Sequence, residues 1–261
     1  MEKRPLILIT NDDGYSAKGI ETLIRAVCHL GDVVVVAPDG PRSGMSSAIT
    51  STIPLRLTKV REVVEDCDVK IYKCSGTPVD CVKIALNQIL PQHPDIVLSG
   101  INHGSNASVN VFYSGTMGAA LEGCICRIPS IGFSICDHNP DADFSPFIDS
   151  IRQITIDVLK KGLPEGICLN VNYPHVEKLK GVRVCRQAET FWSEEFEACV
   201  DPHGKNYYWL TGMPVNRKPE LDNTDDFWLE RGYATIVPTK IDLTADEFIL
   251  EFASRMKESH T

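Results

Sequence analysis

Unbroken runs of apolar residues are the most regular feature of the first part of the chain. Three of them are Leu6–Ile9, Val33–Val36 and Ile96–Leu98. A strand with one wet face alternates apolar and polar residues, so an unbroken run predicts a strand covered on both faces, as in a parallel sheet. Between these runs, apolar residues recur every three to four positions over 20–30 and 79–89, and this spacing predicts helices.

The alternation of strand and helix continues to about residue 160. A further strand is predicted at Pro129–Ile135 and a further helix at Phe147–Leu159. Alternating strands and helices predict an α/β fold of the doubly wound type, with a mostly parallel sheet and right-handed crossovers.

The pattern becomes irregular after about residue 163. Short strands are predicted at Leu169–Asn172, Val182–Val184, Tyr207–Leu210 and Thr235–Val237, and Leu243–Glu247 is expected to open a last helix. Between Phe191 and Asp226, aromatic and polar residues follow no clear period. An irregular segment of this length must bury its aromatic side chains somewhere, so a neighbouring subunit is expected to cover it.

Composition narrows the possible partners and the compartment. The 261 residues are 43% hydrophobic and carry a net charge of −9, with no dense cluster of Lys and Arg, so we expect no wrapping by nucleic acid. An acidic protein can still bind a small phosphate, because a bound cation reverses the local field. No apolar stretch reaches transmembrane length, so no membrane partner is expected. The ten Cys are scattered without a Cys-x-x-Cys pair, which predicts buried small hydrophobes in reducing cytoplasm.

Polar residues follow each of the three apolar runs directly. Asp12 and Asp13 follow the first run, Ser43 lies in the loop after the second, and Asn102 follows the third. Ligands of open α/β sheets bind at the carboxyl ends of the strands, so these side chains are candidates for one site. Carboxylate, hydroxyl and amide oxygens suit Mg²⁺ or Mn²⁺ rather than zinc.

Each of these residues also has a purely structural interpretation. Asp-Gly is an ordinary turn dipeptide, and Ser43 and Asn102 are residue types that satisfy loop backbone. Two adjacent carboxylates after a buried strand nevertheless favour a metal, because their mutual repulsion is costly without a cation.

Two Ser-Gly-Thr triplets precede predicted helices. At Ser75-Gly76-Thr77, the following Pro78 and Asp80 complete a helix-start signature, which favours simple capping. Ser114, Gly115 and Thr116 precede a helix of small residues. A helix N-terminus with free N–H groups and hydroxyls suits a phosphate, so capping and phosphate binding both remain open there.

Together these motifs resemble the SurE family of 5′/3′-nucleotidases, the stationary-phase survival proteins. The residues that carry the resemblance are Asn11–Gly14, Ala37–Asp39 with Arg42–Gly44, Gly76–Pro78 with Asp80–Val82, Ser99–Asn102 and Tyr113–Thr116, followed more loosely by Asn170–Pro174, Thr224-Asp225, Gly232-Tyr233 and Asp242–Thr244. The match is nearly end to end, and it is strongest through residue 134.

The resemblance implies a fold, a site and an activity. It implies a Rossmann-like core over 1–165, with additional strands, an extended hairpin arm and a C-terminal helix over 166–261 that serve oligomerisation, all within a single domain. Asp12, Asp13, Ser43 and Asn102 would hold one Mg²⁺ or Mn²⁺ per subunit, with Asp12 and Asp13 catalytic. Asn106, Ser114, Gly115 and Thr116 would line the phosphate pocket. The expected protein is a homodimer, or a tetramer of paired dimers, that hydrolyses nucleoside monophosphates in the cytoplasm.

Other classes lack the sequence features that they need. A haloacid-dehalogenase-type phosphatase needs Asp-x-Asp after the first strand, whereas Asp12 and Asp13 are contiguous. A dinucleotide-binding oxidoreductase needs Gly-x-Gly-x-x-Gly there, and it is absent. A non-catalytic nucleotide-binding or stress-interaction protein remains as the alternative function.

Overall fold

The computed structural model describes residues 4–60, 64 and 66–258. Its strands are β1 (Leu6–Thr10), β2 (Asp32–Pro38), β3 (Leu57–Lys59), β4 (Val69–Cys74), β5 (Ile96–His103), β6 (Ser130–Ile135), β7 (Ile167–Tyr173), β8 (Val182–Val184), β9 (Thr190–Ser193), β10 (Phe196–Val200), β11 (Asn206–Leu210), β12 (Met213–Asn216) and β13 (Ala234–Lys240). Its α-helices are α1 (Lys18–Val27), α2 (Pro78–Ile84), α3 (Gly115–Ile125), α4 (Ile148–Lys161), α5 (Asp225–Leu229) and α6 (Asp246–Glu258). A π-helical turn over Ala85–Ile89 extends α2, and 3₁₀ turns cover Ser108–Phe112 and Ser145–Phe147.

One nine-stranded sheet forms the centre of the molecule, in the order β3-β4-β2-β1-β5-β6-β7-β13-β8. The six strands from β4 to β7 are mutually parallel, whereas β3 and β13 run antiparallel to their neighbours β4 and β7. The predicted α/β fold with a mostly parallel sheet is therefore confirmed. Strands from both sides of residue 165 contribute to this one sheet.

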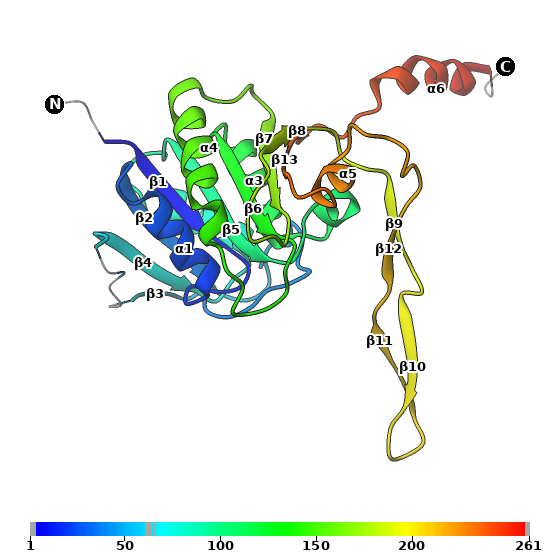
Figure 1. Cartoon of the computed structure of the whole chain (residues 1–261), viewed down its shortest axis with the longest axis horizontal. Helices are drawn as coiled ribbons and strands as arrows, with labels where there is room; N and C mark the ends of the chain where they lie inside the picture. Colours follow the sequence, from blue (N-terminus) through cyan, green and yellow to red (C-terminus); the bar gives the residue numbers. More distant parts are fainter. Residues whose placement is uncertain (1–3, 61–63, 65, 259–261) are drawn as a thin grey trace.

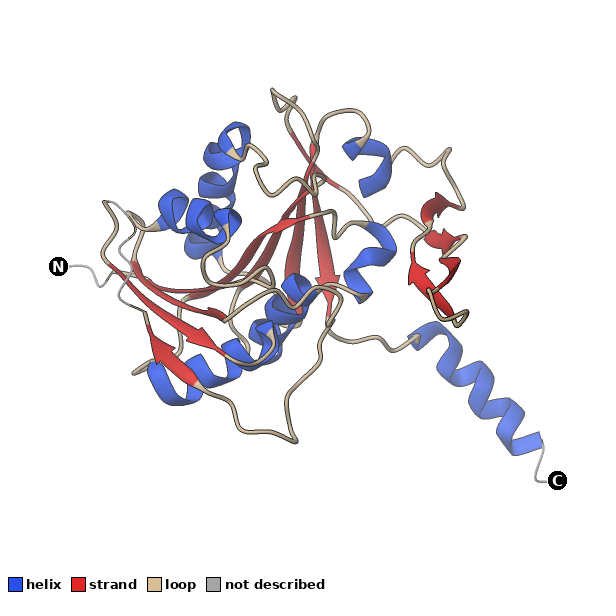
Figure 2. Ribbon diagram, turned by 90° about the horizontal axis from the view of Figure 1, so that it is seen from below, coloured by secondary structure: helices blue, strands red, loops and turns tan. Residues whose placement is uncertain are grey.

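Helices cover both faces of the sheet (Figure 2). α1 and α4 pack against each other on one face, and α2 and α3 do so on the other. Successive residues of a strand point to opposite faces, so Ile7 and Ile9 of β1 join the first layer while Leu8 joins the second. This two-sided burial explains why the central strands are apolar without interruption.

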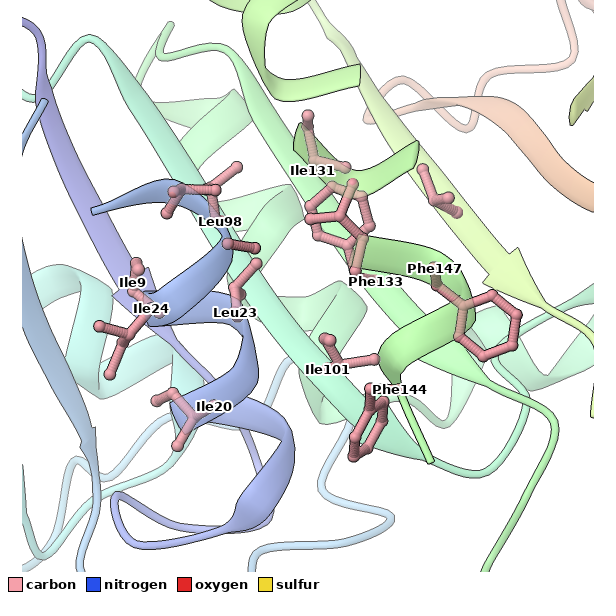
Figure 3. Packing of buried hydrophobic residues seen from close by; sticks show 14 of the residues in the cluster. Ile9, Ile20, Leu23, Ile24, Leu98, Ile101, Ile131, Phe133, Phe144 and Phe147 are labelled. Atoms are coloured by element: carbon pink, nitrogen blue, oxygen red, sulfur yellow. The ribbon is translucent and has the colours of Figure 1, made fainter. Parts of the chain in front are cut away.

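The larger core lies under α1. Ile20, Leu23 and Ile24 of this helix face Ile9 and Leu98 of the sheet (Figure 3). Phe133, Phe144 and Phe147 continue the same apolar layer towards α4, and all three are buried. This packing holds the carboxyl ends of β1, β5 and β6 in place for the site described below.

The irregular segment forms a long two-stranded arm that leaves the core (Figure 1). β9 pairs with β12 at its base, and β10 pairs with β11 towards its tip, where a turn over Asp201–Lys205 reverses the chain. The outer strands are exposed on both faces, and Trp209 is 62% exposed. α6 also stands apart from the core (Figure 1), with its apolar residues Phe248 and Phe252 exposed.

The prediction for the cysteines needs a correction. Cys28, at the end of α1, and Cys67, before β4, are joined by a disulfide with their Cα atoms 5.8 Å apart. They are 39 residues apart in sequence, so no local motif signals the pair. Cys74, Cys81, Cys124 and Cys168 are buried free thiols, as predicted, whereas Cys126, Cys136, Cys185 and Cys199 are half-buried. No helix in the described part of the chain is long and apolar enough to cross a bilayer.

Candidate active site

The candidate site lies at the topological switch point of the sheet, where successive strands begin to be added on the other side of β1. β1 lies between β2 and β5; the chain proceeds from β1 towards β4 on one side, and later from β5 towards β7 on the other. Thr10, the last residue of β1, pairs with Ser99 of β5. A switch of this kind leaves a crevice at the carboxyl ends of the two strands, and Asp12, Asp13 and Asn102 follow there.

Asn11 shapes the turn that carries the two carboxylates. Its amide nitrogen donates to the carbonyl of Gly14 (2.9 Å), and the N–H of Gly14 donates back to its Oδ1 (3.2 Å). Gly14 has φ +105°, a conformation that favours glycine. The motif Asn-Asp-Asp-Gly is therefore a closed turn that presents Asp12 and Asp13 above the end of β1.

Asp12 is a buried carboxylate, only 4% exposed. It accepts a hydrogen bond from the Thr116 hydroxyl, and a Cβ placed on Gly115 would lie 3.0 Å from its own Cβ. The start of α3 therefore lies directly against it. Burial raises the pKa of Asp12 to about 7; the Thr116 hydrogen bond opposes this shift, and the charge of Asp13 adds to it.

Asp13 is half-buried and faces β5. Its Oδ2 accepts a hydrogen bond from the backbone N–H of His103 (3.2 Å). Burial raises the pKa of Asp13 as well, although the His103 N–H partly offsets the shift. The two neighbouring carboxylates are thus both partly removed from solvent.

The two carboxylates have too little positive charge around them. Within the described residues, no Lys or Arg stabilises either carboxylate, and His103 is the only cationic type that acts on Asp13. An uncompensated pair of buried acids fits a site that gains its positive charge from a bound cation. The described residues contain no cluster of three or more His, Cys, Asp or Glu that would hold a metal by itself, so neutral oxygen ligands must complete such a site.

Asn102 and the loop that carries Ser43 both approach this pair. The amide nitrogen of Asn102 donates to the carbonyl of Gly104 (2.7 Å), which leaves its Oδ1 for a ligand. The N–H of Arg42 donates to the carbonyl of Asp12 (2.7 Å), so Ser43 follows directly after a residue bonded to the carboxylate turn. Ser43 is exposed, and within the described residues its hydroxyl makes no hydrogen bond to either carboxylate. All four donors are oxygens, as Mg²⁺ and Mn²⁺ prefer.

The Ser-Gly-Thr triplet at α3 divides its roles. Ser114 is the N-cap, and its hydroxyl accepts from the N–H of Met117 (3.0 Å). The Thr116 hydroxyl is engaged with Asp12. The backbone N–H groups of Gly115 and Thr116 have no acceptor in the described part of the chain, so they are the groups of this triplet available to a phosphate.

Comparison with known proteins identifies the family. The model of the family "Survival protein SurE" matches residues 7–194. The chain belongs to the SurE family. It is 53% identical to the 5′-nucleotidase SurE of Phocaeicola vulgatus over 94% of both chains, and 51% identical to that of Bacteroides fragilis over 97% of this chain and 98% of the relative. The crystal structure of the SurE protein from Aquifex aeolicus superposes with a TM-score of 0.79 at 38% identity, and covers 95% of this chain and 98% of that one.

In this SurE-family chain, hydrogen bonds to β6 and β7 fix both the side chain and the backbone of Asn106. Its side-chain nitrogen donates to Ser134 Oγ (2.6 Å), and its backbone N–H donates to Asn172 Oδ1 (2.8 Å). Asn170 in turn donates to its carbonyl (2.8 Å). Asn170 and Asn172 lie on the same face of the buried strand β7. Two polar residues at alternate positions of an otherwise apolar strand were the sequence signal that could have predicted a buried hydrogen-bond partner for Asn106.

Sequence reasoning also missed what holds the Ser43 loop in the SurE fold. The capping predicted at the start of α2 is confirmed, and Thr77 and Asp80 form a reciprocal capping box there. They do more than cap the helix, because the Thr77 hydroxyl donates to Ala48 (2.7 Å) and the Asp80 carboxylate accepts from the N–H of Thr50 (3.0 Å). Arg42, in the same loop, pairs with Asp39 (2.9 Å).

Proposed function

We propose that this chain is a divalent-metal-dependent 5′-nucleotidase that hydrolyses nucleoside 5′-monophosphates, and 3′-monophosphates, to nucleoside and phosphate. The observation that carries the proposal is the buried Asp12-Asp13 pair at the switch point of the sheet, set against the N-terminus of α3. Relatives that share half of the sequence over nearly the whole chain bear the name 5′-nucleotidase SurE.

The proposed metal ligands are Asp12, Asp13, Ser43 and Asn102. A bound Mg²⁺ or Mn²⁺ supplies positive charge that polarises a phosphoryl oxygen. Thr116 orients Asp12 through its hydroxyl, and Asn102 is oriented by its bond to Gly104. Such partners of ligands fix the direction of the ligand oxygens.

The chain's own groups account for the remaining steps. One of the two carboxylates accepts the proton of the attacking water. The N–H groups of Gly115 and Thr116 donate to the phosphoryl oxygens, and the N-terminal end of α3 favours the negative charge there. Asn106 and Ser114 keep the walls of the phosphate pocket in place through their bonds to Ser134 and Met117.

We further propose that residues 1–165 supply the catalytic core of a single domain and that 166–261 add the elements of oligomerisation. The arm exposes Phe196, Tyr208 and Trp209, and α6 exposes Phe248 and Phe252. Monomers rarely leave so much aromatic surface to solvent, which supports a homodimer or a tetramer of paired dimers.

Phosphate release from AMP tests the activity. We expect release with Mn²⁺ or Mg²⁺, loss of activity in EDTA, and recovery when metal is restored. Full activity in the chelator would reject the metal. Binding of AMP without release of phosphate under any metal would favour the alternative, a non-catalytic nucleotide-binding or stress-interaction protein.

A further inference from the structure

A pocket of about 420 Å³ opens beside the loop that carries Asn106. Its walls come from four parts of the chain: this loop, the ends of β6 and β7, the base of the arm, and α5. The residues used below are Ser105, Cys136, Val176, Asp226, Leu229 and Glu230. Its volume lies in the range of roughly 300–1,000 Å³ that small-molecule sites occupy.

The strand register places this pocket within reach of the proposed metal site. Asn102 of β5 pairs with Ser134 of β6, and Cys136 lies two residues further along the chain. With about 4.8 Å between strands and about 3.3 Å per residue, the pocket wall at Cys136 is about 8 Å from Asn102. Asn106 hydrogen-bonds Ser134 between them, and its neighbour Ser105 lines the pocket. One small ligand can therefore reach both places.

The two carboxylates of the pocket disfavour a phosphate there. Asp226 and Glu230 are its acidic residues, and no Lys or Arg of the described residues lines it; His175, which also lines it, pairs with Asp137 (2.9 Å). A phosphoryl group would be repelled there, whereas a neutral hydroxylated group would find acceptors. Asp226 is half-buried; its Oδ2 accepts from Asn216 (2.7 Å), and its Oδ1 accepts no hydrogen bond from the described part of the chain. A carboxylate so placed suits the hydroxyls of a ribose.

Asp225 makes the pocket rigid. This carboxylate is fully buried and accepts from the N–H (2.7 Å) and hydroxyl (3.0 Å) of Ser108 and from the N–H of Ala188 (2.8 Å). Thr190 at the base of the arm accepts from the N–H of Val109 (3.1 Å). α5, the arm and the site loop are therefore fastened together, and the walls of the pocket are formed before a ligand arrives.

We propose that this pocket is the nucleoside subsite, with the ribose on Asp226 and the base against the apolar wall of Val176 and Leu229. The phosphate then points out of the acidic pocket towards Asn102 and α3. This assignment rests on the proposed function, since it places the nucleoside, the part of the substrate that the metal and phosphate site does not bind. It predicts that substrates are recognised as nucleosides and that a second phosphate on the ribose is disfavoured beside Asp226.

Titration calorimetry with adenosine tests the pocket without any need for turnover. We expect adenosine to bind the full-length protein in the presence of Mn²⁺. Val176→Trp, which fills the pocket, should weaken this binding at least about tenfold. Val184→Trp is the matched control, because Val184 is an exposed residue of β8 that does not line the pocket. It should leave the affinity within about twofold. No binding of adenosine, or equal binding by the two variants, would overturn the assignment.

Kinetics on two esters provide a second readout. Val176→Trp should raise KM for AMP by a clearly larger factor than KM for glycerol phosphate, which has no base. Equal losses on both esters would contradict the proposal. If Val176→Trp does not fold, Asp226→Asn replaces it. Asp226→Asn should weaken adenosine binding and improve hydrolysis of a nucleoside 3′,5′-bisphosphate relative to AMP. Unchanged adenosine binding together with an unchanged preference between the two substrates would overturn the assignment. Hydrolysis of neither ester by the wild type would reject the proposed function, and the adenosine titration would still decide the pocket.

Discussion

The hydroxyl of Thr116 donates a hydrogen bond to the carboxylate of Asp12, across 104 residues of sequence. The contact joins the turn after β1 to the start of α3. It makes Thr116 a positioning residue for Asp12 and leaves the capping of α3 to Ser114. The two residues of one triplet thus have separable roles, and these roles can be tested separately.

We expect Thr116→Val to weaken Mn²⁺ binding and AMP hydrolysis by about ten- to a hundredfold, because loss of the partner of a ligand has that typical effect. Ser114→Ala is the matched control from the same triplet. It should lower the free energy of unfolding by about 1 kcal/mol through the lost cap, with Mn²⁺ affinity nearly unchanged. Mn²⁺ titrations and denaturant unfolding of both variants measure this. A stability loss in Thr116→Val without a change in metal affinity would contradict the assigned role.

We expect Asp12→Asn to abolish most activity and yet to stabilise the metal-free protein. In the absence of a cation, Asp12 is a buried carboxylate beside a second one, and both the desolvation and the repulsion favour a neutral side chain. The melting temperature should therefore rise in EDTA, and the increase in melting temperature on addition of Mn²⁺ should shrink. Near-normal turnover at saturating Mn²⁺ would show that Asp12 is no ligand.

Asp80 should stabilise the fold in a pH-dependent manner. Burial by itself would raise its pKa, but the hydrogen bonds from Thr50 and Thr77 outweigh burial and leave the pKa below its usual value. An acid with a lowered pKa in the folded state stabilises that state above its unfolded pKa, near 4, and the stabilisation is lost as the pH falls through the folded pKa. Asp80→Asn should thus lose about 1–2 kcal/mol at pH 7, and its gap from the wild type should be smaller at pH 3. Denaturant unfolding at the two pH values measures the difference, and a gap that is independent of pH would contradict it.

Shortening the arm should change assembly and spare the site. Removal of 191–226 would be a poor test, because it also removes Asp225, which fastens the site loop. Replacing 194–212 by a two-residue Asn-Gly turn removes β10 and β11 and keeps the pairing of β9 with β12, as well as α5. We expect light scattering to give fewer subunits per particle, with Mn²⁺ binding retained. An intact protein with the sharp mass of a monomer at micromolar concentration would reject the proposed assembly.

The strand-end residues show how far sequence patterns reach. An unbroken apolar run predicts a strand buried on both faces, and the residues after each run predict which side chains gather at the carboxyl edge. Asp12 and Asp13, just after β1, and Asn102, near the end of the neighbouring strand β5, do lie at that edge. Their role as metal ligands stays a prediction, as does that of Ser43.

Partners distant in sequence were beyond such patterns. The contacts of Asp12 with Thr116 and of Asp225 with Ser108, and the disulfide of Cys28 with Cys67, depend on how elements far apart in the chain are brought together. Propensity and periodicity describe a residue's immediate neighbours, and they carry no information on which loop faces which.

By itself, the sequence determined the class of fold, the alternation of strands and helices, the capping box of α2 and the family, because each depends on local spacing or on motif order. Only the tertiary structure decided that Thr116 serves Asp12, that Asp225 bonds Ser108, and that the site loop, the arm and α5 enclose a pocket. The physical reason is that hydrogen-bond partners and cavities are properties of packed surfaces, and those surfaces exist only after the sheet has set its strand order.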